Sequence, residues 1–523
     1  MKRAIYTKLI PLWMGIFLFY LLTLAPTVLW GDHAYFQRSA FAGLLKQDGG
    51  GHWLWLQLAQ IFVDLPIASV AYRLNLLSAV AATVTLIFLS GAMRALKLSW
   101  TSVIFACIAL AVSHTFWMHA VRAEVYTVFT AVLALQLWLW LSWRPEKSWT
   151  VHLAAALFGL ALLAHQMAIL FLPAALFLLW RQRKWFSRRD WFIFLGTFVA
   201  GLLPFFVVVN QQIAGPNFVS SLRLYFTHVD VDFAPAMFDF SLSRFPLDFA
   251  LWLGFLGLQF VGLSGLLGIY GLLPMRILAP ENTEGFEGRL KFSSFSFSSV
   301  AISDQQNSWL SLLIFYAVSV FFAFSYRVND QFVFYLPSYI AFSFFIANGW
   351  QKLQALPPAK TTIAKIAALL LIVGLPISVY FAAPLVLAAS QVNPLEIRTL
   401  PGRDPNQYFL WPASHQDDGA ETYARSALQA AAPNSVIIAD HTPFEPLIYL
   451  QTVEGVRPDV NLIRIEPGDD LAPIVHELSA DTVIYLADNN PNYYNLASLP
   501  ELCLKPAGNI YQLFLDVSSD LCP

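Results

Sequence analysis

The chain has 523 residues, of which 57% are hydrophobic and only 12% are charged. Because soluble domains carry about 25% charged residues, this composition excludes an ordinary soluble protein and predicts a polytopic membrane protein. The net charge of −2 conceals an asymmetry, since the residues from 390 onward carry 6 Lys and Arg against 18 Asp and Glu, and the rest carry 25 against 15. We therefore expect a transmembrane domain over 1–389 and a soluble acidic domain over 390–523.

Apolar stretches of about 17–25 residues are needed to cross a bilayer as helices. The sequence contains about eleven candidates, and the fifth and sixth are short and meet near His165. The candidates are 9–30, 74–92, 100–118, 124–143, 150–164, 167–180, 192–210, 249–273, 309–325, 332–350 and 365–387. The predicted fold class is therefore an α-helical polytopic membrane protein.

Basic residues follow every second predicted span, which is the pattern of loops on the cytoplasmic side. The strongest signal is "RQRKWFSRR" at 181–189, after the sixth span. This arrangement predicts a cytoplasmic N-terminus, and eleven spans then place the acidic C-terminal domain outside. The chain has no Asn-x-Ser/Thr acceptor, which favours a multi-pass protein of the bacterial plasma membrane over one of the endoplasmic reticulum.

The first outer loop begins with "GDHAYF", directly after the first apolar stretch. Asp32 could cap a helix, or it could be a general base that takes a proton from an acceptor hydroxyl at the membrane surface. Farther along the loop, "GHWLWLQLAQIFVDLPI" at 51–67 has the pattern of a helix lying in the membrane interface. Such a helix would form one wall of a lipid-facing cavity.

The remaining outer loops hold most of the other unusual polar residues of the membrane part. They are Arg122, Glu124, His165, Arg327, Asn329 and Asp330. Arginine suits a phosphate because its planar guanidinium binds two oxygens at once, so a lipid-phosphate substrate would find ligands here. Each residue also has a plain structural interpretation: an interfacial Arg with a capping Glu, a hydrogen-bonded core His, and turn-forming Asn and Asp.

A metal ion is a further alternative in this region. Asp32, Glu124 and Asp330 offer the hard oxygen ligands that Mg²⁺ or Mn²⁺ prefers. The sequence has only three Cys residues and no CxxC or His/Cys cluster, so we expect no structural zinc site and assign no metal. Cys503 and Cys522 could pair if the C-terminal domain faces an oxidising compartment.

From residue 390 the sequence alternates between helix-like and strand-like segments, among them "AETYARSALQAA", "SVIIAD" and "FEPLIYLQTVEG". This alternation predicts a small α/β domain with a largely parallel sheet. Its first strand is not followed by GxGxxG, so a dinucleotide site is unsupported.

With these motifs in hand, the chain resembles the GT-C superfamily of membrane glycosyltransferases. Within it, the chain is most similar to a bacterial family of unknown function that is related to eukaryotic membrane protein O-mannosyltransferases. The resemblance runs through "LAPTVLWGDHAYFQ", "FWMHAVRAEVYTVFTAVLAL", "LLAHQMAILFLPA", "YRVNDQFVFYLPSYIAF" and "YLQTVEGVRPDVNLI". The "AEVYT" segment and the "ND…YLP" turn are its most specific parts.

The resemblance implies sugar transfer on the outer face from a polyprenyl-phosphate-linked donor, with Asp32 as the base. The chain departs from the family where Asp-Ser-Gly-Glu is usual, because Asp32 is followed by His33, Ala34 and Tyr35. Tyr35 thus stands where the family usually has its second acidic residue, and "DGGGHWLW" at 48–55 stands where the family usually has a Pro-Pro-Gly-Tyr-Pro stretch. Three other carboxylates remain as replacements: Asp48, Glu124 and Asp330.

The predicted function is therefore an inverting glycosyltransferase with Asp32 and Glu124 as catalytic residues. Arg122, Arg327 and His165 would bind the donor phosphate, and Asp330, Asn329, Tyr35 and His33 would support the acceptor. The acceptor could be a protein, a glycan or a lipid, and no nucleic acid is expected. The alternatives are a transporter or flippase of lipid-linked sugars, and a scaffold that has lost its activity. The lack of an internal repeat weighs against a transporter.

Overall fold

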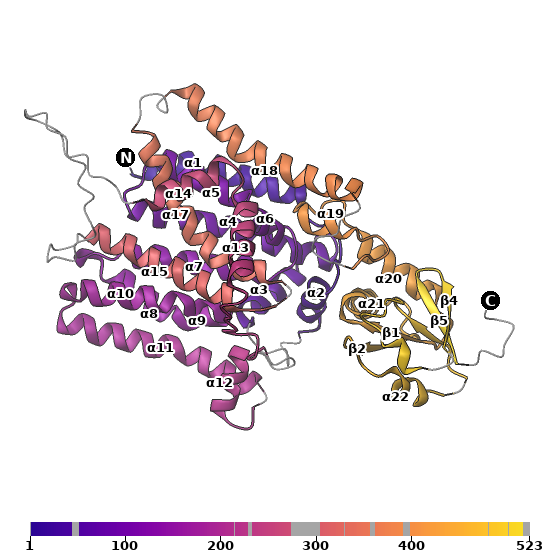
Figure 1. Ribbon diagram of the computed structural model, residues 1–523. Helices are drawn as coiled ribbons and strands as arrows, with labels where there is room; N and C mark the ends of the chain where they lie inside the picture. Colours follow the sequence, from indigo (N-terminus) through magenta and orange to yellow (C-terminus); the bar gives the residue numbers. More distant parts are fainter. Residues whose placement is uncertain are drawn as a thin grey trace, which may run out of the picture.

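The computed structural model describes residues 2–43, 52–213, 215–227, 233–273, 304–328, 330–355, 361–390, 398–479, 481–499 and 502–515, without the side chains of 2–8 and 212. Asp48, Asn329 and Cys522 lie outside the described residues. Figure 1 shows a helical part and, at one end of it, a smaller α/β part that ends at the C-terminus.

Four helices are long and apolar enough to cross a membrane: α4 (Val70–Ala95), α11 (Arg188–Gln212), α15 (Asp304–Ser325) and α18 (Thr362–Ser390). Two bent pairs raise the number to six if each pair is one span. In the first pair, α5 (Trp100–Ala111) and α6 (His114–Ala120) meet at 71°, and in the second, α13 (Phe245–Gln259) and α14 (Leu263–Leu272) meet at 117°. The described helices thus include four to six candidate membrane spans by length and composition, as an integral membrane protein requires.

The other helices of this part are shorter or less apolar. They are α1 (Lys2–Thr23), α2 (Asp32–Ala42), α3 (Trp53–Val63), α7 (Tyr126–Leu141), α8 (Trp149–Ala156), α9 (Phe158–Ala164), α10 (Leu172–Gln182), α12 (Phe218–Thr227), α16 (Gln331–Phe334) and α17 (Leu336–Leu353). Short 3-10 turns η1 (Pro145–Lys147), η2 (Gln166–Phe171) and η3 (Arg183–Trp185) connect some of them.

The first apolar stretch differs from the predicted continuous helix over 9–30. Helix α1 ends at Thr23, and residues 24–31 are not helical before α2 begins at Asp32. Pro26 lacks a backbone N–H, and Gly31 has a φ of 58°, a backbone conformation that only glycine adopts without strain. Asp32 therefore opens a second helix instead of ending the first.

Two other predictions about this part can be compared with the structure. The predicted interfacial segment forms α3, in which Trp55 is buried against the core and Ile61 is exposed. The predicted break near His165 is present, because α9 ends at Ala164 and η2 begins at Gln166; that the segments on either side are two membrane spans stays a prediction. His165 between them has an extended backbone with a φ of −169°.

Helices α14 and α17 pack at very close range through small residues. A Cβ atom added to Gly271 would meet the Phe345 carbonyl, and one added to Gly349 would meet the Leu267 carbonyl. Gly349→Ala is therefore expected to lower stability by about 1–3 kcal/mol, the usual cost of overpacking. Thermal unfolding in detergent measures this. Gly374→Ala is the matched control because its added Cβ meets no atom within 4 Å, and equal melting temperatures for both variants would contradict the prediction.

The α/β part contains one five-stranded sheet in the order β2-β1-β3-β5-β4. The strands are β1 (Val436–Asp440), β2 (Asn461–Ile465), β3 (Ile484–Leu486), β4 (Cys503–Ala507) and β5 (Ile510–Phe514). Strand β1 pairs in parallel with β2 and β3, whereas β5 pairs antiparallel with β3 and β4. The prediction of a largely parallel sheet is thus wrong: the sheet is mixed, because β4 and β5 form a hairpin that turns at Gly508, whose φ is 66°.

Helices α19 (Pro405–Leu410), α20 (Gly419–Ala430), α21 (His441–Glu454) and α22 (Leu471–His476), with the 3-10 turn η5 (Leu496–Ser498), complete this part. A buried ion pair fixes the start of α21. Arg398 donates to both carboxylate oxygens of Asp440 at 2.9 and 3.1 Å. Asp440 also accepts from the Tyr494 hydroxyl and caps α21 through the Thr442 N–H. The first residue of α21, His441, is therefore held in a defined position.

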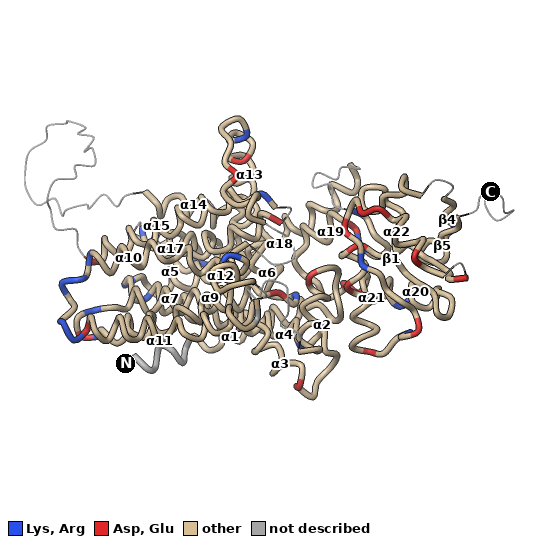
Figure 2. Tube along the Cα trace, turned by 90° about the horizontal axis from the view of Figure 1, so that it is seen from below, with Lys and Arg blue, Asp and Glu red and all other residues tan. Residues whose placement is uncertain are grey.

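The two parts meet where α2 packs against α21. The Gly31 N–H donates to the Thr442 carbonyl at 3.3 Å, and the Ser414 N–H donates to the Thr23 carbonyl at 2.9 Å. Figure 2 shows the basic segment 181–189, around the ends of α10 and α11, at the opposite end of the molecule from the sheet. The helical part thus has two distinct ends, one rich in Arg and Lys and one covered by the α/β part.

Candidate active site

Asp32 lies at the junction between the helical and α/β parts. It is the first residue of α2, and its side chain is 66% exposed. Its Oδ1 lies 2.8 Å from Nε2 of His441 in α21. The helix dipole also favours an acidic residue in the first turn of a helix. Asp32 can therefore stabilise the start of α2 and act as a site residue at the same time.

A second carboxylate, Glu124, is buried in the loop that precedes α7. His33 Nδ1 lies 3.0 Å from Glu124 Oε1 and 3.1 Å from the Ala123 carbonyl oxygen. Because both neighbours are acceptors, this nitrogen carries the proton. Burial raises the pKa of Glu124, and the charge of Asp32 raises it further. The hydrogen bond and charge of His33 act in the opposite direction. The residue after Asp32 thus holds Glu124 in place.

The third carboxylate, Asp330, precedes α16 and is accessible to solvent. Although the residue has exposed surface, the surrounding protein atoms reduce the hydration of its carboxyl and raise its pKa to about 7, and the charges of Asp32 and Glu124 add to this rise. The charges of Asp32 and Glu124 thus both act on Asp330. Asp32 is also connected to Glu124 through the adjacent residue His33, whose ring contacts Glu124. Near pH 7 Asp330 changes between its neutral and charged forms.

Arg122 is a buried cation beside this group. Its Nε donates to the Ser414 hydroxyl at 2.8 Å, and its Nη2 donates to the Tyr408 carbonyl at 3.1 Å. The guanidinium groups of Arg122 and Arg403 both lie over the Tyr408 ring, at 4.5 and 4.4 Å from its centre. Within the described residues Arg122 forms no ion pair with a carboxylate. Desolvation raises the pKa of the partly buried Asp417, and the charge of Arg122 opposes this rise.

Arg327 has a different environment from Arg122. It pairs with Asp239 at 2.9 Å and with Asp248 at 3.1 Å, so two carboxylates neutralise its charge. The structure therefore favours Arg122 over Arg327 as the residue with positive charge available to a phosphate.

The other predicted site residues have well-defined packing. His165 is buried, its Nδ1 accepts from the Met167 N–H at 3.1 Å, and its ring lies 5.4 Å from that of Tyr126. This agrees with the interpretation of a hydrogen-bonded core histidine. Tyr35 lies on α2, one turn from Asp32, with the Arg38 guanidinium 5.5 Å from its ring centre.

Sequence reasoning missed three residues of this junction: His441, Tyr408 and Ser414. All three belong to the α/β part, in which the sequence singled out no candidate site residue. The only sequence signal for His441 is its place directly after the apolar strand "SVIIAD", since polar residues at the carboxyl ends of strands often line sites in α/β folds.

A metal ion is not favoured by the geometry. Within the part of the chain that the structure describes, no group of three or more His, Cys, Asp or Glu residues is arranged to hold a metal ion. Asp32 and Glu124 each contact a histidine instead.

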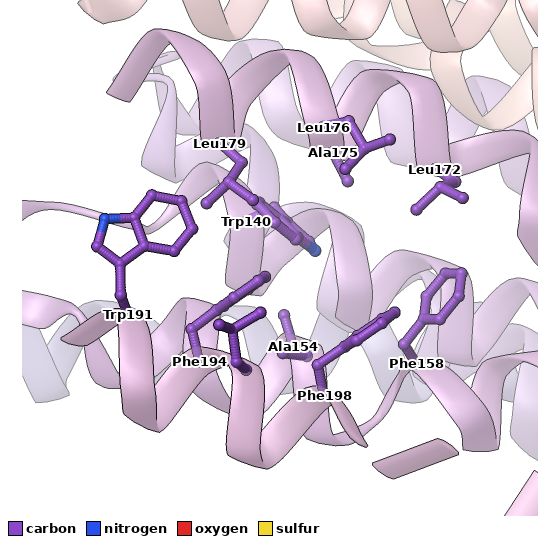
Figure 3. Close-up of a pocket in the computed structure, with 12 residues that line it drawn as sticks. Trp140, Ala154, Phe158, Leu172, Ala175, Leu176, Leu179, Trp191, Phe194 and Phe198 are labelled. Carbon is purple, nitrogen blue, oxygen red and sulfur yellow. The ribbon is translucent and has the colours of Figure 1, made fainter. Parts of the chain in front are cut away.

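An apolar cavity of about 240 Å³ lies away from these residues, among α7, α8, α9, α10 and α11. Figure 3 shows aromatic and aliphatic side chains around it, including Trp140, Phe158, Trp191 and Phe198. Its lining contains no titratable residue, so it offers no acid, base or phosphate ligand.

Comparison with known proteins supports a relation to membrane glycosyltransferases. Residues 49–188 match the family model described as the protein O-mannosyl-transferase TMEM260 N-terminal domain. This segment contains α3, Arg122 and Glu124. No curated protein matches the sequence.

Three solved structures are similar to the chain. ArnT from Cupriavidus metallidurans, bound to undecaprenyl phosphate, has a TM-score of 0.58 and 12% identity, over 98% of this chain and 99% of that one. Two further structures match more weakly. The Archaeoglobus fulgidus oligosaccharyltransferase has a TM-score of 0.44 and 11% identity, over 86% of this chain and 64% of that one. The arabinofuranosyltransferase AftD from Mycobacteria has a TM-score of 0.47 and 12% identity, over 97% of this chain and 39% of that one. The chain therefore has an ArnT-like fold, and over residues 49–188 it resembles the protein O-mannosyl-transferase family.

Proposed function

We propose that this protein is a GT-C-type glycosyltransferase that moves a sugar from a polyprenyl-phosphate donor to an acceptor hydroxyl on the extracytoplasmic face of a plasma membrane. The observation that carries the proposal is the junction where Asp32 contacts His441 and the adjacent His33 contacts Glu124. Arg122, two residues before Glu124, is a buried cation without a carboxylate partner among the described residues. Undecaprenyl phosphate in the similarly folded ArnT supports a polyprenyl-phosphate donor.

The proposed reaction is a single displacement. Asp32 takes the proton of the acceptor hydroxyl, the acceptor oxygen forms a bond to the anomeric carbon, and the bond from that carbon to the phosphate oxygen breaks. The leaving group is polyprenyl phosphate, whose added negative charge Arg122 stabilises. One displacement inverts the anomeric configuration. In this account Glu124 and its partner His33 orient the acceptor, together with Tyr35 and Asp330, while His165 and Arg327 support the donor site.

The proposed topology extends the spans identified above to about eleven. Basic segment 181–189 would be cytoplasmic, and the α/β part, 390–523, would lie outside as a separate domain. This placement brings Asp32 to the outer membrane surface, where the phosphate of a lipid donor would lie. The shorter helices α1, α7, α9, α10 and α17 would complete the bundle around the donor lipid.

The experiment that tests the function offers labelled polyprenyl-phosphate mannose, glucose and arabinose, with cell-envelope acceptors, to the purified protein in nanodiscs. Release of polyprenyl phosphate with labelling of the acceptor is the expected result. A parallel assay in proteoliposomes follows movement of the donor between leaflets. Donor movement without any transfer would contradict the enzyme and favour a flippase.

Donor binding is expected to weaken as the pH rises through about 7. Above its raised pKa of about 7, Asp330 is charged and repels the anionic phosphate, so the donor KM should rise with pH. In Asp330→Asn this rise should be largely lost, because the remaining group does not ionise. The KM of both proteins between pH 5.5 and 8.5 measures it, with the exposed Asp64→Asn as a control that keeps the wild-type profile. The same KM rise in Asp330→Asn would exclude Asp330 as its cause.

A further inference from the structure

A chain of charged groups connects Asp32 to the interior of the α/β part. His441 Nε2 contacts Asp32 Oδ1 at 2.8 Å, and Nδ1 on the other side of the ring lies 3.7 Å from Oε1 of Glu445. Glu445 is completely buried one turn along α21. The histidine thus lies between an exposed carboxylate of the helical part and a buried carboxylate of the α/β part.

The buried carboxylate is firmly held. Arg38 of α2 donates to Glu445 Oε2 from Nε at 3.3 Å and from Nη2 at 3.1 Å. Arg464 of β2 lies 3.8 Å from Oε1. Because Arg38 and Asp32 are on the same helix, α2 contacts α21 twice: once through Asp32 and His441, and once through Arg38 and Glu445.

The backbone around His441 leaves the imidazole little freedom. Asp440, itself paired with Arg398, caps α21 immediately before the histidine. Gly31, immediately before Asp32, donates its N–H to the carbonyl of Thr442. A Cβ atom on Gly31 would lie 3.8 Å from His441 Nε2, which is an ordinary contact distance, so the imidazole ring lies directly beside the start of α2.

We propose that His441 is a positioning residue for Asp32, through which the α/β part orients the base of the sugar-transfer reaction. The proposal rests on the proposed function. By donating from Nε2 to Oδ1, His441 limits rotation of an otherwise exposed carboxylate, and such fixed geometry is what efficient proton transfer requires. The soluble part would then be needed for catalysis itself, in addition to any acceptor binding.

The protonation of His441 strengthens this contact. Burial and the charge of Arg464 lower the pKa of His441. The hydrogen bond and charge of Asp32, with the charge of Glu445, raise it by more, so the pKa of His441 is raised overall. Because the pKa is raised on folding, the charge-assisted bond from His441 to Asp32 stabilises the protein fully below about pH 6.5, the pKa of an unperturbed histidine. This stabilisation is lost as the pH rises through the pKa of His441 in the folded protein.

The test compares two variants of His441 with a control. His441→Ala removes the donor, whereas His441→Gln keeps an N–H near the Nε2 position without the charge. His476→Gln changes an exposed histidine at the end of α22. In nanodiscs, His441→Ala should lower kcat by about 100-fold with an unchanged donor KM, His441→Gln should recover part of that loss, and His476→Gln should match the wild type.

Combining the variants with Asp32→Asn separates positioning from a structural role. If His441 acts through Asp32, His441→Ala should lower kcat no further in the Asp32→Asn background. Equal loss in both backgrounds, or a change in KM alone, would overturn the positioning role. A second measurement requires no activity: the unfolding midpoints of the wild type, His441→Ala, Asp32→Asn and the double variant at pH 6 and 9. These midpoints should show a coupling between His441 and Asp32 that is larger at pH 6.

These outcomes distinguish failure of this inference from failure of the proposed function. A wild type that transfers sugar while His441→Ala matches it would overturn only the role of His441. A wild type that releases no polyprenyl phosphate with any donor would overturn the transferase and the positioning role together. In that case the unfolding data would still report whether the contact between the two parts forms.

Discussion

Asp32→Asn is expected to lower kcat for sugar transfer by about 10²–10⁴-fold, the usual contribution of a general base. The amide has the shape of the carboxylate and its oxygen can still accept from His441, which lies 2.8 Å from Oδ1. The substitution therefore removes the basicity of the side chain and largely preserves its packing. Because the donor phosphate is bound by other residues in this account, the donor KM should change little.

Polyprenyl phosphate release and acceptor labelling, measured over a range of donor concentrations, give kcat and KM separately. Asp64→Asn is the matched control, since Asp64 is also exposed and lies in the same outer loop, at the end of α3. Release by Asp32→Asn at the rate of the wild type would keep the enzyme but assign the base to Glu124 or Asp330.

Arg122→Gln is expected to lower kcat by about 10²–10³-fold, the effect of removing one group that stabilises developing negative charge. It should also raise the donor KM, since the phosphate is already charged in the bound donor. Arg122→Lys should recover only part of the loss, because an ammonium group lacks the planar fork that binds two oxygens and that also contacts Ser414 and Tyr408.

Arg122→Gln also removes contacts between the two parts of the protein, so its folding has to be followed by thermal unfolding. Arg144→Gln is a suitable control, because Arg144 is partly buried and, like Arg122, donates to backbone carbonyls, among them that of Ala95. If Arg122→Gln folded and kept the wild-type kcat and KM, the phosphate would have to bind elsewhere.

Much of the architecture could be predicted from local sequence signals. The apolar stretches correspond to helices, "GHWLWLQLAQIFV" contains α3, and the alternation after residue 390 corresponds to α20, β1 and α21. The errors arose where a few residues override the pattern. Pro26 and Gly31 interrupt an apolar run that hydropathy alone extends to Trp30, and the turn at Gly508 reverses a strand in a sheet expected to be largely parallel.

The candidate site was predictable in part, because charged groups in an apolar sequence attract attention at once. Asp32, Arg122, Glu124 and Asp330 were all singled out for that reason. The residues that these groups contact could not be predicted, since Asp32 and His441, for example, are 409 positions apart in the chain. Likewise, the sequence shows that Arg327 is charged, but only the fold shows that Asp239 and Asp248 neutralise it.

The most direct test of the central claim is the product of the reaction. Purified protein in nanodiscs would be given a labelled polyprenyl-phosphate sugar of known anomeric configuration and an acceptor. We predict one polyprenyl phosphate released for each sugar transferred, with the opposite anomeric configuration in the product. A product with retained configuration would contradict single displacement with Asp32 as base, and movement of intact donor across the bilayer without any product would contradict the transferase.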